Sequence, residues 1–160
     1  MSLGRPFARA MAMDDASWRR HANPWSGWSR VATTPVLFAA LWSHVHLGWW
    51  ALVPIGLVGF WLWLNPRLFP PPASRRAWMT RGVLGERLWV EGRAVAGAEV
   101  AWILAGQALL TAIGLAGVAA QAFWVGLVGL HAGAAMKLWF LDRMVRVYDA
   151  SQEATGRPPT

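Results

Sequence analysis

Few residues of this chain could do chemistry, and His131 is the one that lies deepest within apolar sequence. The small residues Gly129, Ala132, Gly133 and Ala134 flank it and leave space beside the imidazole. An ionisable side chain in such a setting is a candidate functional group, and one role open to it is axial ligation of a tetrapyrrole, either haem or chlorophyll. The favoured interpretation is a neutral histidine that is hydrogen-bonded to Gln107 or Thr111.

A second group of candidates lies where apolar sequence gives way to charged sequence. Lys137, Asp142 and Arg143 belong to such a boundary, where charges usually pair with one another or extend toward polar surroundings. Asp142 and Arg146 have the four-residue spacing of a helical ion pair, so we expect an ion-pair network that arginines of other helices join. The alternative is a site for a lipid or an anionic headgroup. Its candidates are Arg30, Arg67, Lys137 and Arg143, with His21 and Asp142 beside them.

Other chemistries are excluded or unsupported. The chain has no cysteine, so it has no disulfide, no thiolate metal site and no cysteine nucleophile. His44 and His46 are two residues apart, which on a helix directs the side chains about 200° apart, and no nearby acidic residue completes a metal site. No positioned nucleophile or carboxylate pair is evident. We therefore predict neither a metal site nor catalytic residues.

Two long stretches without Asp, Glu, Lys or Arg, 31–66 and 100–136, must position these candidates. Each would form a helix of about 55 Å, whereas the hydrocarbon core of a bilayer is about 30 Å thick. Each stretch therefore crosses twice. The sequence predicts an all-α polytopic membrane protein with four transmembrane helices in two helical hairpins, at 24–65 and 98–147.

The individual spans are expected at 24–45, 49–65, 98–118 and 121–147. Asn23 and Pro24 have the residue types of a helix start, and Gly48 suits the break between the first two spans. Gly126, Gly129 and other small residues of the last two spans predict a tightly packed helix pair. Between the hairpins lies a basic loop, 66–97, whose residues 73–93 are expected at the membrane interface. The segments 1–23 and 148–160 flank the hairpins, and the second of these is expected to be disordered from 149 onward.

Charge placement predicts the topology. The fifteen Lys and Arg residues all lie outside the two apolar stretches, so the positive-inside rule places both termini and the central loop in the cytoplasm, in the cell inner membrane. A formal charge of +7 would suggest nucleic acid in a soluble protein, but beside membrane spans it indicates contact with anionic lipid, and no nucleic-acid partner is expected. The thirteen tryptophans are typical interfacial anchors, Trp18 among them. The alternative is an aromatic lining for a lipid, quinone or pigment.

Several motifs carry a family resemblance. They are HANPWSGWSR at 21–30, LWSHV at 41–45, WLNPRLFPPP at 63–72 and KLWFLDRMV at 137–145. In these strings, which cover about residues 18–149, the chain resembles a family of small prokaryotic multi-span membrane proteins of unknown function. The resemblance implies no activity. It implies only that the two Asn-Pro pairs and the Leu-Asp-Arg string belong to one constellation.

The expected function follows from these observations. We expect a non-enzymatic integral membrane protein that serves as an accessory or assembly subunit of a larger bioenergetic complex, photosynthetic or respiratory, or of a transport complex, with membrane lipids and other membrane subunits as partners. One alternative is a protein or enzyme that binds a lipid or an anionic headgroup at the cytoplasmic face. The other is tetrapyrrole binding through His131.

Overall fold

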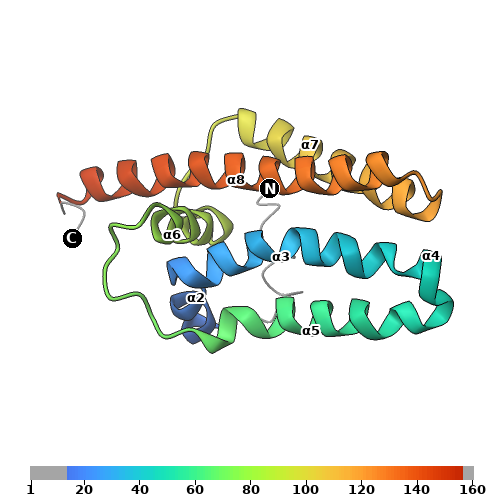
Figure 1. Ribbon diagram of the computed structural model, residues 1–160. Coiled ribbons are helices and arrows are strands. Elements are labelled where there is room, and N and C mark those ends of the chain that lie inside the picture. Colours follow the sequence, from blue (N-terminus) through green and yellow to red (C-terminus); the bar gives the residue numbers. More distant parts are fainter. Residues whose placement is uncertain (1–13, 157–160) are drawn as a thin grey trace.

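The computed structural model describes residues 14–156, and all regular structure in this part of the chain is helical (Figure 1). The all-α prediction is confirmed. In chain order the helices are α2 (Asp15–His21), α3 (Pro24–Trp42), α4 (His44–Leu47), the 3₁₀ helix η1 (Gly48–Ala51), α5 (Leu52–Leu68), α6 (Trp78–Val90), α7 (Glu99–Ala119) and α8 (Phe123–Ala154).

Helix α3 begins where the sequence predicts. The Asn23 side chain accepts a hydrogen bond from the Trp25 amide at 2.9 Å, and Pro24 occupies the first helical turn. Pro24 needs no amide partner there, and Asn23 satisfies one of the free N–H groups of the helix end. The Asn23 side-chain amide also donates to the Pro70 carbonyl oxygen at 2.9 Å. One side chain thus joins the start of α3 to the segment that follows α5.

Helices α3 and α5 run antiparallel and lie side by side (Figure 1). The short helices α4 and η1 connect them, and Gly48 provides the positive φ of 52° at the reversal. Three stretches are long and apolar enough to cross a membrane: Pro24–Leu68, which contains both of these helices, Glu99–Ala119 and Phe123–Ala154. The predicted count of four spans is therefore corrected to three candidate spans. The physical reason is that the reversal remains helical and that α5 by itself has only 17 residues.

Helices α7 and α8 form the predicted tight pair. A Cβ atom on Gly114 would lie 2.5 Å from the Leu130 amide nitrogen, and one on Gly117 would lie 2.5 Å from the Gly126 amide nitrogen. Only glycine permits backbones to approach so closely. The chain turns between these helices at the same end of the molecule as α4 (Figure 1). We call this end the turn end and the opposite one, which carries α2 and α6, the basic end.

Helix α6 lies across the C-terminal part of α8, which runs on past the start of α7 (Figure 1). Two expectations are corrected here. The segment 73–93 is more than an interfacial surface stretch, because α6 is packed among α2, α3 and α8. Residues 149–154 are not disordered but continue α8, because Asp149 pairs with Arg81 of α6 at 2.8 Å and Tyr148 is buried. Residues 157–160 lie outside the described part.

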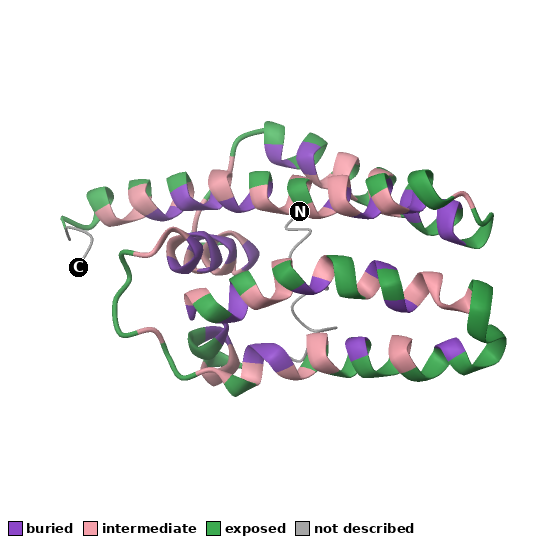
Figure 2. Ribbon diagram, in the orientation of Figure 1, coloured by how far each residue is buried: buried purple, intermediate pink, exposed green. Residues whose placement is uncertain are grey.

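Burial is concentrated at the basic end, around α2 and α6 (Figure 2). A core of Met79, Phe140, Met144 and neighbours joins α6 to α8. Trp18, expected at the membrane surface, is instead buried with Ala22 and Val83. Toward the turn end the hairpins expose large apolar side chains, as helices solvated by lipid would. They include Trp49, Trp50, Leu57, Leu109, Trp124 and Val128.

We predict that Gly114→Ala destabilises the protein, by about 1–3 kcal/mol, because the new methyl group meets backbone atoms of α8 that cannot move aside. The matched control is Gly56→Ala on α5, where a Cβ atom meets nothing within 4 Å. Removing a glycine from a helix should there stabilise by about 0.5–1 kcal/mol. Thermal unfolding of both purified variants in one detergent measures the difference. Equal unfolding temperatures would contradict the close α7–α8 contact.

Candidate functional site

Four polar side chains from four helices meet inside the basic end. His21 comes from α2, Arg30 from α3, Glu86 from α6 and Lys137 from α8. The Lys137 ammonium donates to a Glu86 carboxylate oxygen at 2.7 Å, and it also lies 4.3 Å from the centre of the Phe140 ring. Arg30 donates to His21 Nε2 at 3.2 Å. We call these four residues the junction cluster.

The junction cluster has more positive than negative charge. Glu86 is the one carboxylate, and it is 8% exposed. Arg30 and Lys137 are cations, and the hydrogen bonds of the Arg30 side chain among the described residues go to the Ser26 carbonyl oxygen and to His21. A guanidinium group only donates hydrogen bonds, so His21 Nε2 must accept and the ring proton lies on Nδ1. With His21 neutral, one positive charge has no negative partner.

The environment keeps His21 neutral. Burial, together with the positive charges of Arg30 and Lys137, lowers the pKa of His21 well below its usual value of 6.5. The His21 ring is 6% exposed, and its Nδ1 atom has no hydrogen-bond partner among the described residues. Protonation would place a third cation beside two others.

A polar seam aligns the helices that carry this cluster. The Asn65 side chain of α5 is fully buried; it accepts from the Ser26 hydroxyl and donates to the Ser29 hydroxyl, each at 2.8 Å. One turn further, the Trp61 indole donates to the Thr33 hydroxyl at 3.0 Å. These bonds fix the register of α5 against α3. The two Asn-Pro motifs therefore lie at the same end of the hairpin.

A cleft of about 380 Å³ opens between α3 and α8 beside the junction cluster. We call it the interhelical cleft. Its polar lining includes Arg30, Lys137 and Gln107, and the buried Oε1 atom of Gln107 has no partner among the described residues. The remaining walls are mostly apolar, with Val31, Leu37, Leu62, Leu138 and Leu141 among them. A cleft with a cationic rim and apolar walls suits an amphiphile with an anionic head.

The four predicted headgroup residues are only partly brought together. Arg30 and Lys137 share the interhelical cleft, whereas Arg67 and Arg143 are not in its lining. The Arg67 guanidinium stacks on the Trp63 ring at 4.4 Å. The Asp142–Arg146 pair expected from the four-residue spacing is present at 3.6 Å, and the Asp142 carboxylate also lies 3.4 Å from Arg143 of the same helix.

His131 has a partner that the sequence did not predict. Its Nδ1 atom lies 2.7 Å from the Leu127 carbonyl oxygen of the preceding turn, and its ring meets the Phe38 ring edge-on at 6.4 Å. Neither Gln107 nor Thr111 is its hydrogen-bond partner among the described residues. Thr111 packs against Gly133, while Gln107 faces the interhelical cleft. Tetrapyrrole ligation by His131 stays a prediction.

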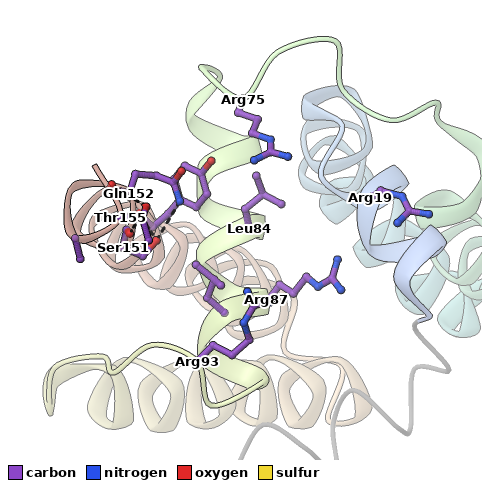
Figure 3. A pocket seen from close by; sticks show the side chains of 11 residues that line it. Arg19, Arg75, Leu84, Arg87, Arg93, Ser151, Gln152 and Thr155 are labelled. Carbon is purple, nitrogen blue, oxygen red and sulfur yellow. Dashed lines mark hydrogen bonds between the residues drawn. The ribbon is translucent and has the colours of Figure 1, made fainter. Parts of the chain in front are cut away.

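A second cavity, of about 590 Å³, lies between α6, α2 and the end of α8 (Figure 3). We call it the arginine pocket. Four arginines line it together with residues from the last turns of α8: Arg19, Arg75, Arg87, Arg93, Tyr148, Ser151, Gln152 and Thr155. Sequence reasoning missed this site, because it treated the end of α8 as a disordered tail. The four-residue spacing of Arg87 and Glu91, which pair at 2.7 Å, was a local signal of helix α6, which forms another wall of the pocket.

The fold and the site define a class: an all-helical protein with three candidate membrane spans and a polar cluster buried at one end. The chain belongs to DUF6653, a family of unknown function, whose sequence profile matches residues 3–159. No curated protein and no solved structure matches the chain. Membership of a family of unknown function is thus confirmed, and the finer description as small prokaryotic multi-span membrane proteins stays a prediction.

We predict that stability falls as the pH is lowered from 7.5 to 5.5. Because the folded-state pKa of His21 lies well below 6.5, below that pH the unfolded chain binds a proton that the folded protein does not. The slope is at most about 1.4 kcal/mol per pH unit. The control is His21→Gln, whose carbonyl oxygen can still accept from Arg30 but does not titrate. Unfolding temperatures measured across this range should fall less for the variant, and parallel curves would contradict the assignment.

Proposed function

We propose that the protein is a non-enzymatic membrane protein that binds an amphiphile with an anionic head in the interhelical cleft. The observation that supports this most strongly is the unbalanced charge of the junction cluster. Arg30 is half-buried and forms no ion pair of its own among the described residues, since the nearby Glu86 carboxylate is paired with Lys137. A cation held out of water is costly unless an anion pairs with it. A carboxylate or phosphate at the rim of the cleft would supply that anion.

In this proposal the three candidate spans lie in the membrane, the first of them folded back as the antiparallel helices α3 and α5, with the basic end in the cytoplasm at the inner membrane. Helix α5, at about 25 Å, approaches the thickness of the hydrocarbon core. No Lys or Arg occurs at 31–66 or 94–136, so the turn end carries neither. Trp49, Trp50 and Trp124 are exposed there, at the level of an outer interface. Both termini then lie on the cytoplasmic side, as the positive-inside rule requires.

The depth of the cleft fits an amphiphile. Arg30 is six residues into α3, about 9 Å from its start, so it lies near the headgroup level. Leu37 lies about 10 Å deeper along the same helix. A headgroup beside Arg30 and Lys137 would therefore have its chain directed along the apolar walls toward the turn end.

The accessory-subunit function expected from the sequence is a second candidate, and one observation favours it. Gly56 and Gly59 lie exposed on α5, and a Cβ atom at either position meets nothing within 4 Å. The glycines of α7 and α8 are used for packing within the chain, whereas these two leave a flat surface that a helix of another subunit can approach.

We predict that Arg30→Gln reduces the retention of phosphatidylglycerol about tenfold or more, because a charge-assisted contact in a poorly solvated site contributes about 1.5–3 kcal/mol. The measurement is native mass spectrometry of protein from nanodiscs that contain phosphatidylglycerol and phosphatidylcholine. The control is Arg146→Gln, which removes the same charge from an exposed position on α8.

Equal lipid retention by the two variants would contradict the proposed site. The same mass spectra also test the second candidate function, that of an accessory subunit. A co-purifying membrane protein that is lost from Gly56→Leu but kept by Arg30→Gln supports a subunit interface on α5.

A further inference from the structure

The arginine pocket is separate from the interhelical cleft, and its lining points to a different ligand. None of the residues that line it is acidic, and four of them are arginines. Arg87 pairs with Asp15 and Glu91, and Arg93 pairs with Glu91 at 3.0 Å. Neither of these two acids belongs to the lining of the pocket.

Two cations of the pocket remain uncompensated. Arg19 of α2 and Arg75, which precedes α6, form no ion pair or side-chain hydrogen bond with any residue of the described part, 14–156. Figure 3 shows the Arg75 and Arg87 side chains extending toward the gap between α6 and α2, with Arg19 on the α2 side of that gap. The charges of Arg87 and Arg93 are balanced by Asp15 and Glu91, whereas those of Arg19 and Arg75 are not. The pocket therefore has a net charge of about +2 that a ligand can neutralise.

The walls of the pocket are fixed before any ligand arrives. The Arg87–Asp15 ion pair joins α6 to α2, and the Arg81–Asp149 ion pair at 2.8 Å joins α6 to α8. Ser151 donates to the Tyr148 carbonyl oxygen at 2.6 Å, which shapes the α8 wall. Because these contacts fix the helices that form the walls, a ligand has to order only side chains of the pocket and not its backbone.

The position of the pocket places it beyond the hydrocarbon layer of the proposed membrane arrangement. Ser151 lies 28 residues after Phe123 on α8, which is about 42 Å along the helix axis, against a hydrocarbon core of about 30 Å. The pocket is therefore at the aqueous edge of the headgroup region. A ligand can reach it from the water or from a lipid headgroup.

From these observations we infer that the arginine pocket binds a phosphate group that carries two negative charges, held between Arg19 and Arg75. The guanidinium fork matches the oxygens of a phosphate in geometry and charge. The cavity of about 590 Å³ is larger than a single phosphate needs, so the group belongs to a larger molecule. Two sources share this chemistry: a soluble phosphorylated molecule and the headgroup of a phosphomonoester lipid.

The test uses the full-length protein in nanodiscs of phosphatidylcholine, titrated with pyrophosphate and, at equal ionic strength, with sodium chloride. The Arg19→Gln/Arg75→Gln variant should bind pyrophosphate at least about tenfold more weakly than the unmodified protein. The matched control is Arg20→Gln/Arg76→Gln, which removes the same charge from the adjacent residues, neither of which lines the pocket. Its affinity should stay within about threefold.

A second arm replaces pyrophosphate with phosphatidic acid in the nanodisc and follows the rise in unfolding temperature. A response to either probe that depends on Arg19 and Arg75 supports the site, and the probe that gives the response identifies the source. Lack of response to both probes, or an equal loss in the Arg20/Arg76 control, overturns it. Arg30 does not line the arginine pocket, so Arg30→Gln should leave pyrophosphate binding unchanged. The proposal for the arginine pocket and the proposal for the interhelical cleft can therefore be contradicted independently.

Discussion

The arrangement at the basic end depends on the pairing of one buried carboxylate with a cation from another helix. Glu86 lies on α6 and is 8% exposed. A carboxylate so placed is tolerated only with a partner, and Lys137 of α8 supplies it at 2.7 Å. Arg30 of α3 completes the arrangement through His21. The ion pair thus specifies where α6 sits between the two hairpins.

The two ends of the molecule are stabilised by different interactions. At the turn end, α7 and α8 approach through Gly114, Gly117 and Gly126. At the basic end, Asn65 and its serine partners set the register of α3 and α5 by hydrogen bonds. Backbone contact between glycines favours close packing without specifying a ligand. Buried polar groups specify a geometry and leave charge available, and the interhelical cleft lies beside such a group, the junction cluster.

Much of the fold could be predicted from the sequence, because the residues that start, reverse and pack its helices act through their own type and spacing. The start of α3 at Asn23 and Pro24, the reversal at Gly48 and the glycine contacts of α7 and α8 all depend on residue types close together in the chain. What the sequence missed are interactions over long separations. Lys137 and Glu86 are 51 residues apart, and Arg81 and Asp149 are 68 apart.

The second of those long-range pairs explains why the end of α8 was predicted to be disordered. Residues 149–154 are mostly polar, and their composition gives no sign that α6 packs against this part of the chain and stabilises it as helix. The candidate sites likewise include one part that the sequence predicts and one part that it does not. Arg30 and Lys137 were named from the sequence as headgroup residues, but the arginine pocket depends on α8 continuing past residue 148. Without that continuation Ser151 and Gln152 have no fixed place.

The most direct test of this account is a double-mutant cycle on Glu86 and Lys137, using Glu86→Gln, Lys137→Met and the combined variant, with the free energy of unfolding measured in one detergent. If the buried ion pair positions α6 between the hairpins, each single substitution destabilises the protein and the combined variant loses less than the sum, with a coupling energy of about 1–3 kcal/mol. Additive effects, with no coupling between the two positions, would contradict the account.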